Sequence, residues 1–95
     1  MLTGADPYYC AGVNFGDAMK PMHPGKLHGM IVQNNANIFK AFIEFPKPLI
    51  VAINGPAIGA CVTSATVADA IIASEKATFA TPFARLGQFY KVLLI

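Results

Sequence analysis

The longest periodic pattern of apolar side chains lies between Pro24 and Pro46. The apolar positions recur at the three- and four-residue spacing of an α-helix. They are Leu27, Ile31, Ile38, Phe42 and Phe45, with Asn34 as the one polar position in the stripe. Because proline is accepted at the start of a helix and ends one further on, the pattern predicts a helix between the two prolines. The stripe is its predicted packing face, and Lys40 and Glu44, four residues apart, lie on another face.

A continuous apolar run follows Pro48. Residues 49–53 are all apolar and mostly β-branched, which is typical of a strand buried on both faces of a parallel sheet. After a turn at residues 54–56, the small side chains of residues 59–67 predict a closely packed helix. Further short strands are predicted at 70–73 and 77–80, and the first residues predict a strand end followed by a long loop. Alternating strands and helices favour a layered α/β fold.

Composition excludes several classes of protein. The chain has 95 residues, 55% of them apolar and 13% charged, so it is one small domain and not a disordered segment. The seven basic residues are scattered and form no patch, which argues against a nucleic-acid partner. The uncharged stretch 48–68 is long enough to cross a membrane, but Gly55 and Pro56 interrupt it as a helix.

The two cysteines, Cys10 and Cys61, are too few for a disulfide framework and lack the spacing of metal ligands. Reduced thiols in an intracellular compartment are therefore expected. The N-terminus has neither the basic nor the apolar region of a secretory signal peptide.

Two glycine-containing loops carry the candidate chemistry, at residues 3–14 and 54–60. In the second loop, Gly59 and Ala60 would open a helix directly after a strand. Unpaired backbone N–H groups at such a point bind a phosphate or an oxyanion that develops during a reaction. Strand–turn–helix joints with glycine are also common without any ligand, and both interpretations stay open on this pattern alone.

Five segments in order then resemble the enoyl-CoA hydratase/isomerase (crotonase) superfamily. Residues 45–59, Phe-Pro-Lys-Pro-Leu-Ile-Val-Ala-Ile-Asn-Gly-Pro-Ala-Ile-Gly, resemble the family signature, and Thr3-Gly4 with Tyr9-Cys10-Ala11-Gly12 resembles its first substrate loop. Residues 68–70 and 77–83 follow at matching places. The nearest resemblance is to peroxisomal Δ3,Δ2-enoyl-CoA isomerases and to the crotonase-like domain of chromodomain-Y-like proteins.

This resemblance implies an α/β fold, a partial ClpP/crotonase-like ββα spiral that is truncated at both ends. It covers residues 1–88 and leaves 89–95 as an unmatched tail. Full-length relatives form homo-oligomers, whereas the assembly of this chain stays open. An isolated fragment that does not fold stably is a further alternative.

The resemblance also implies a site that binds an acyl-CoA thioester. Two backbone N–H groups, those of Val13 and Ala60, match the oxyanion hole that holds the thioester oxygen as it becomes an enolate. The matching substrate-binding residues are Ala11, Gly12, Val13, Asn14, Phe15, Gly59 and Ala60. No metal or redox cofactor is implied, since coenzyme A belongs to the substrate.

The general base is missing from the matched positions. Hydratases of the family use two glutamates, where this chain has Thr63 and Phe83. The isomerases use a glutamate a few residues beyond position 88, and no glutamate follows Glu75 here. The implied parent activity is Δ3-to-Δ2 enoyl-CoA isomerisation in fatty-acid β-oxidation, with this chain itself inactive.

Two alternatives to that activity remain, a non-catalytic acyl-CoA- or protein-binding module of chromodomain-Y-like type and an enoyl-CoA hydratase. The resemblance implies a peroxisomal location for the parent protein, with the mitochondrion as the alternative.

Overall fold

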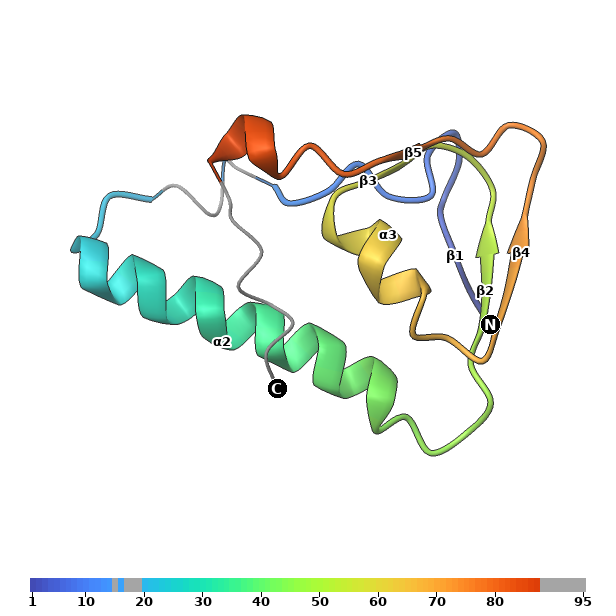
Figure 1. Cartoon of the computed structure of the whole chain (residues 1–95), viewed down its shortest axis with the longest axis horizontal. Coiled ribbons are helices and arrows are strands. Elements are labelled where there is room, and N and C mark those ends of the chain that lie inside the picture. Colours follow the sequence, from blue (N-terminus) through green and yellow to red (C-terminus); the bar gives the residue numbers. More distant parts are fainter. Residues whose placement is uncertain (15, 17–19, 88–95) are drawn as a thin grey trace.

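The computed structural model describes residues 1–14, 16 and 20–87. Three parallel strands form one sheet in the order β1-β2-β4, and two parallel strands form a second sheet, β3-β5 (Figure 1). The strands are β1 (Leu2–Thr3), β2 (Ile50–Ile53), β3 (Ala57–Ile58), β4 (Ala70–Ala73) and β5 (Phe79–Ala80). The helices are α2 (Pro24–Ile43), α3 (Ala60–Ala65) and the 3-10 turn η1 (Ala84–Leu86). The predicted α/β class is confirmed.

Strand β2 is the centre of the larger sheet. It pairs in register with β1 through Leu2 and Val51 and with β4 through Val51 and Ile71. The start of the β2–β4 pair is fixed by a reciprocal contact, in which the Leu49 N–H donates to the Asp69 carboxylate at 2.7 Å and the Asp69 N–H donates to the Leu49 carbonyl at 3.0 Å.

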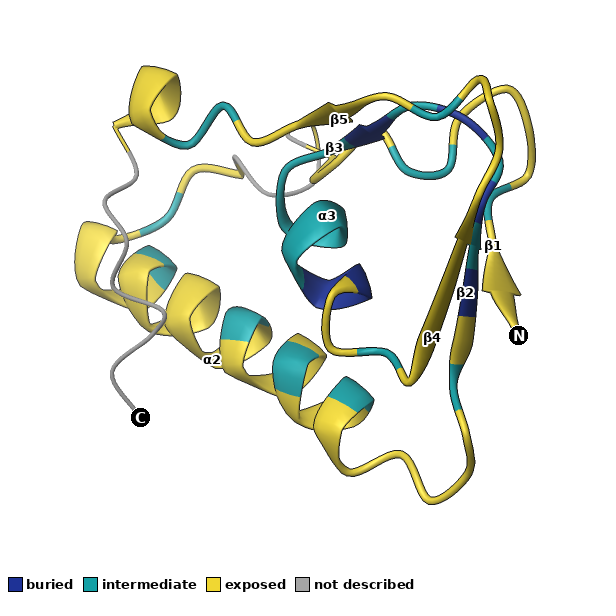
Figure 2. Ribbon diagram, turned by 45° about the vertical axis from the view of Figure 1, so that its right-hand side comes forward, coloured by how far each residue is buried: buried dark blue, intermediate teal, exposed yellow. Residues whose placement is uncertain are grey.

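The prediction that this strand is buried on both faces is wrong in part. Val51 and Ile53 are buried, but Ala52 is half-buried and Ile50 is exposed. The side chains of β2 alternate between the two faces of the sheet, and within the described residues only the face toward α3 is well covered (Figure 2). The core is correspondingly small, with Val51, Ile53, Ala57 and Ala65 as its buried apolar side chains.

The predicted helix is confirmed as α2, which begins at Pro24, one residue after the N-cap His23. The His23 ring accepts a hydrogen bond from the Gly25 N–H at 3.2 Å. Lys40 and Glu44, predicted to lie on another face of this helix, form an ion pair with 3.8 Å between the Lys40 Nζ and a Glu44 carboxylate oxygen. Both of its side chains are exposed, so it adds little stability.

The predicted packing face of α2 is only partly correct. Leu27 and Phe42 are half-buried as predicted, but Ile31, Ile38 and Phe45 are exposed. The half-buried positions are Leu27, Asn35, Phe39 and Phe42. This set is rotated from the predicted stripe because α2 lies against the short helix α3 and not against a broad surface (Figure 1).

The turn after β2 is pressed against the first loop of the chain. The Asn54 side-chain oxygen accepts from the Gly4 N–H at 3.0 Å, and the Tyr9 N–H donates to the Pro56 carbonyl at 3.0 Å. Gly55 is buried between these contacts, and a Cβ atom at this position would collide with the Pro7 carbonyl oxygen. A glycine at this point is what lets the two loops approach each other.

No helix in the described part of the chain combines the length and the apolar character that a membrane span requires.

The close approach at Gly55 predicts a large and position-specific effect on stability. Gly55→Ala should lower the free energy of unfolding by about 2 kcal/mol or more, because the added methyl group must displace backbone. The matched control is Gly29→Ala within α2, where a Cβ meets no atom within 4 Å. This control should raise the free energy of unfolding by about 0.5–1 kcal/mol. Urea unfolding of both variants measures the difference, and equal effects would contradict the described loop contact.

Candidate functional site

Strand β3 holds the first loop on one side and β5 on the other. Cys10 forms a parallel bridge with Ala57, and the Ile58 N–H donates to the Cys10 carbonyl at 3.0 Å. On the opposite side, the Gly59 N–H donates to the Ala80 carbonyl at 2.8 Å. Two segments that lie about seventy residues apart in the sequence, at Cys10 and at Ala80, therefore run alongside the same short strand, just before α3 begins.

Both predicted donors follow a glycine in a left-handed conformation. Gly12 has a φ of 96° and Gly59 a φ of 79°, values that glycine adopts without strain. Each glycine sets the direction of the peptide N–H of the next residue, Val13 or Ala60. Gly12 is further restricted by a close neighbour, since a Cβ there would lie 3.2 Å from the Ile58 carbonyl oxygen.

The N–H of Ala60 belongs to the first residue of α3, whose N-cap is Gly59. The first N–H groups of a helix have no acceptor within it, which leaves the Ala60 N–H available for a ligand. Because α3 has only six residues, we attribute any anion binding to this donor itself and not to a helix dipole. Val13, which carries the other predicted donor, is 60% exposed.

The structure places the remaining predicted substrate residues on the same two segments. Ala11 and Asn14 are exposed in the first loop with Gly12 and Val13, while Gly59 and Ala60 are half-buried. Phe15 lies outside the described residues. The first loop contacts the strand that leads into Gly59 and Ala60, and the oxyanion hole itself stays a prediction.

The two positions where hydratases carry glutamate also lie near this strand. The Thr63 hydroxyl donates to the Ala60 carbonyl at 3.0 Å, within α3. The ring of Phe83 lies beside Gly59, since a Cβ built there would be 4.0 Å from the Phe83 Cε1 atom. Neither side chain has a basic group, so this end of β3 presents an apolar wall and a hydroxyl in place of two carboxylates.

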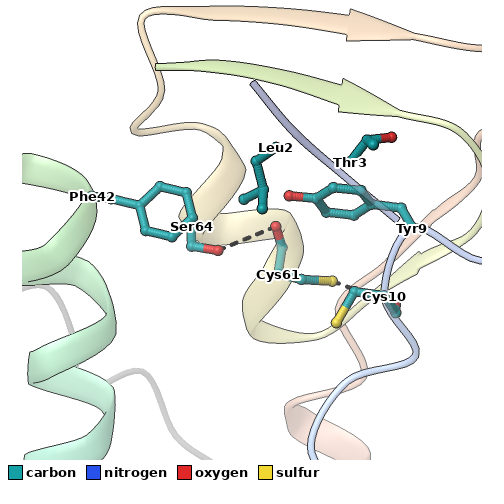
Figure 3. A pocket seen from close by; sticks show the side chains of 7 residues that line it. All are labelled: Leu2, Thr3, Tyr9, Cys10, Phe42, Cys61 and Ser64. Atoms are coloured by element: carbon teal, nitrogen blue, oxygen red, sulfur yellow. Dashed lines mark hydrogen bonds between the residues drawn. The ribbon is translucent and has the colours of Figure 1, made fainter. Parts of the chain in front are cut away.

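A cavity of about 230 Å³ lies between α2, α3 and the first loop (Figure 3). It is lined by Leu2, Thr3, Tyr9, Cys10, Phe42, Cys61 and Ser64. None of these belongs to the predicted substrate residues. The sequence signal for it was weak, namely two small side chains three residues apart on α3, Cys61 and Ser64, and one aromatic ring from the distant helix α2.

Within this cavity burial raises the pKa of the Cys61 thiol, and a hydrogen bond with the Cys10 side chain raises it further. Burial likewise raises the pKa of the Tyr9 hydroxyl, with smaller contributions from Cys61 and Cys10. A nucleophilic cysteine needs a lowered pKa or an adjacent base. These shifts support a packing role for Cys61 over a catalytic one.

Comparison with known proteins defines the family. The profile described as enoyl-CoA hydratase/isomerase matches residues 1–94, so the chain belongs to this family. The match extends past residue 88, where the sequence analysis ended the domain.

Several curated proteins are similar over most of this chain. "Enoyl-CoA delta isomerase 2" of Rattus norvegicus is 44% identical over 93% of the chain, which spans 23% of that protein. "Enoyl-CoA delta isomerase 3, peroxisomal" of Mus musculus is 35% identical over 93% of the chain and 28% of its own length. "Testis-specific chromodomain protein Y 1" of Homo sapiens is 33% identical over 93% of the chain and 17% of its own length. The chain thus spans between 17% and 28% of the length of these relatives.

The raised pKa values predict that the reduced protein becomes less stable in alkali. The unfolded chain releases the Cys61 and Tyr9 protons near the ordinary pKa values of 9.0 and 10.0, whereas the folded chain holds them to higher pH. The contribution of these two groups to the free energy of unfolding is therefore complete below about pH 9. It is lost as the pH rises through their pKa values in the folded chain. Between pH 8.5 and 10.5 the free energy of unfolding of the parent should fall. In Cys61→Ser this fall should be smaller, because the part that comes from the thiol is absent.

Urea unfolding with a reductant present, at intervals across that pH range, measures this fall. Tyr8→Phe is the matched control, since Tyr8 is an exposed neighbour and the change leaves the cavity thiol in place. A Cys61→Ser protein whose stability declines as steeply as that of the parent would overturn the prediction.

Proposed function

We propose that this chain binds an acyl-CoA thioester and holds the thioester oxygen with the backbone N–H groups of Val13 and Ala60. The observation that carries the proposal is the pairing of β3 with the first loop through the Ile58 N–H and the Cys10 carbonyl. It supports the proposal because it joins the first loop, which carries Gly12-Val13, to the strand that precedes Gly59-Ala60, the two pairs that the family resemblance assigns to substrate.

Backbone donors suit an enolate because their positions are fixed before the substrate arrives. As the α-carbon loses a proton, negative charge develops on the thioester oxygen, and two N–H groups stabilise it there. One such donor typically contributes about 10²–10³ to the rate of an acyl-transfer enzyme. The proposed chemistry calls for no metal or redox cofactor, and coenzyme A enters as part of the substrate.

The parent activity that we propose is the shift of a 3-enoyl-CoA double bond to the 2-position in fatty-acid β-oxidation. Relatives whose names include "enoyl-CoA delta isomerase" support it. One of them is named as peroxisomal, and we propose the same organelle for the parent protein, with the mitochondrion as the alternative.

The chain described here would bind its ligand without turning it over. Thr63 and Phe83 stand where hydratases have glutamates, and no glutamate follows Glu75. A positioned general base typically supplies about 10²–10⁴ in rate, and the described site contains none. Hydration, which needs two carboxylates, is the activity that these side chains support least.

A second candidate function is a non-catalytic module that binds acyl-CoA or protein. The similarity to a testis-specific chromodomain protein and the Phe83 ring beside Gly59 favour it. The two candidates differ in the parent protein, where only the isomerase would carry a base.

Titration calorimetry of the chain with a 3-enoyl-CoA tests binding, and absorbance of the conjugated 2-enoyl thioester tests turnover. We expect saturable binding without turnover. Gly12→Ala should weaken binding about three- to tenfold, because the displaced Val13 N–H loses one hydrogen bond to the ligand. Gly29→Ala is the matched control and should bind like the parent.

Three other results of this titration would contradict parts of the proposed function. Turnover above the uncatalysed rate would contradict the missing base. Equal affinities for Gly12→Ala and the parent would contradict the role of the first loop. An absence of binding in a chain that shows a cooperative unfolding transition would overturn the proposed function.

A further inference from the structure

The chain has two cysteines, and the fold places them side by side although 51 positions separate them. The Cys61 thiol lies 3.5 Å from the Cys10 carbonyl oxygen and 3.2 Å from the Ile58 carbonyl oxygen. The Cys10 side chain also contributes to the raised pKa of the Cys61 thiol. Both thiols are free, half-buried and part of the wall of the same cavity (Figure 3).

Backbone contacts hold this pair in place. Cys10 is fixed on both sides, since its N–H donates to the Pro56 carbonyl at 3.3 Å and its carbonyl accepts from Ile58 at 3.0 Å. Cys61 lies in the first turn of α3, directly after β3. The proximity of the thiols therefore follows from the same strand that organises the candidate site, and it is lost when the chain unfolds.

We propose that Cys10 and Cys61 form a redox pair that closes into an intramolecular disulfide when the protein meets a peroxide. Nothing in the acyl-CoA chemistry requires this bond. It is a covalent link between the first loop and α3.

The reaction balances with a peroxide as the oxidant. One thiolate attacks the peroxide, the O–O bond breaks, and a sulfenic acid forms with release of an alcohol or water. The second thiol then attacks the sulfenic sulfur, its proton leaves with the departing hydroxyl group as water, and the S–S bond forms. Two thiols lose two electrons in total, and the peroxide gains them.

The surroundings of the pair make the closure slow near neutral pH. The ionisable groups that face Cys61 are Cys10 and Tyr9, and the seven described residues lining the cavity include no charged side chain. Burial raises the pKa of Cys61, so less of it is thiolate than in an exposed cysteine. The fixed geometry offsets this, because the second step needs no loop closure.

The position of the bond would matter to the candidate site. Cys10 stands just before Ala11 and Gly12, and Cys61 directly follows Ala60. If the proposed function holds, the disulfide ties together the two segments that carry the oxyanion donors. The test below reads the bond by mass, so its failure is distinguishable from a failure of acyl-CoA binding.

The experiment treats the dilute, reduced chain with hydrogen peroxide and stops the reaction at intervals with N-ethylmaleimide. Intact mass then counts the unmodified thiols, and a non-reducing gel separates monomer from dimer. We expect a monomer in which both thiols become protected together and are both restored by dithiothreitol. At equilibrium with graded concentrations of dithiothreitol, the disulfide should resist reduction at least about tenfold better in native buffer than in denaturing urea, where bonding must first close the loop.

Single-cysteine variants provide the matched controls. Cys10→Ser and Cys61→Ser should each lose the protected monomer and give sulfenic acid or dimer instead. The oxidised parent should also unfold at a higher urea concentration than the reduced parent, because the bond restricts the unfolded chain.

Three results would overturn the proposal. They are formation of intermolecular dimers alone, oxidation of each thiol to a product that dithiothreitol does not reverse, and equal resistance of the disulfide to dithiothreitol in native buffer and in urea. A chain that fails to fold would give the third result and would count against the proposal as well.

Discussion

The hydrogen bonding of one short backbone segment, from Gly55 to Gly59, organises the rest of the described structure. This segment accepts from Tyr9 through Pro56, donates to Cys10 through Ile58 and donates to Ala80 through Gly59. Backbone can be enclosed in this way only where all its polar groups find partners and where a side chain does not block the approach. Gly55, against the Pro7 carbonyl, meets the second condition. The first loop, β5 and α3 all take their positions from this segment.

The sequence predicted the features of the fold that neighbouring residues decide better than the features that distant contacts decide. The bounds of α2 and β4 follow local signals, namely the proline at the start of the helix and the apolar run Ala70–Ala73, and both are confirmed. Which faces are buried is decided by distant neighbours. Ile31 and Ile38 were assigned to the packing face of α2 on periodicity, yet they are exposed, because periodicity identifies a stripe but not the size of the surface that meets it.

The same distinction holds for the candidate site. Val13 and Ala60 came from a family resemblance and from the glycines before them, and the positive φ values of Gly12 and Gly59 fit that assignment. Composition predicts reduced thiols at Cys10 and Cys61 and does not indicate whether they are in contact. Their contact depends on a parallel bridge between Cys10 and Ala57, a tertiary event with no signature in either local sequence. The cysteine count argues against a disulfide framework, but it cannot place the two side chains.

The chemistry of the site finally rests on what surrounds the donors. An oxyanion hole stabilises charge wherever it forms, while the reaction that follows depends on which group removes a proton. At the end of β3 the neighbours are the Phe83 ring and the Thr63 hydroxyl, which already donates to the Ala60 carbonyl. An apolar ring beside a backbone donor excludes water and strengthens a hydrogen bond to an enolate. It cannot activate a water molecule for addition. Under the proposed function, these neighbours suit polarisation of a thioester better than its hydration.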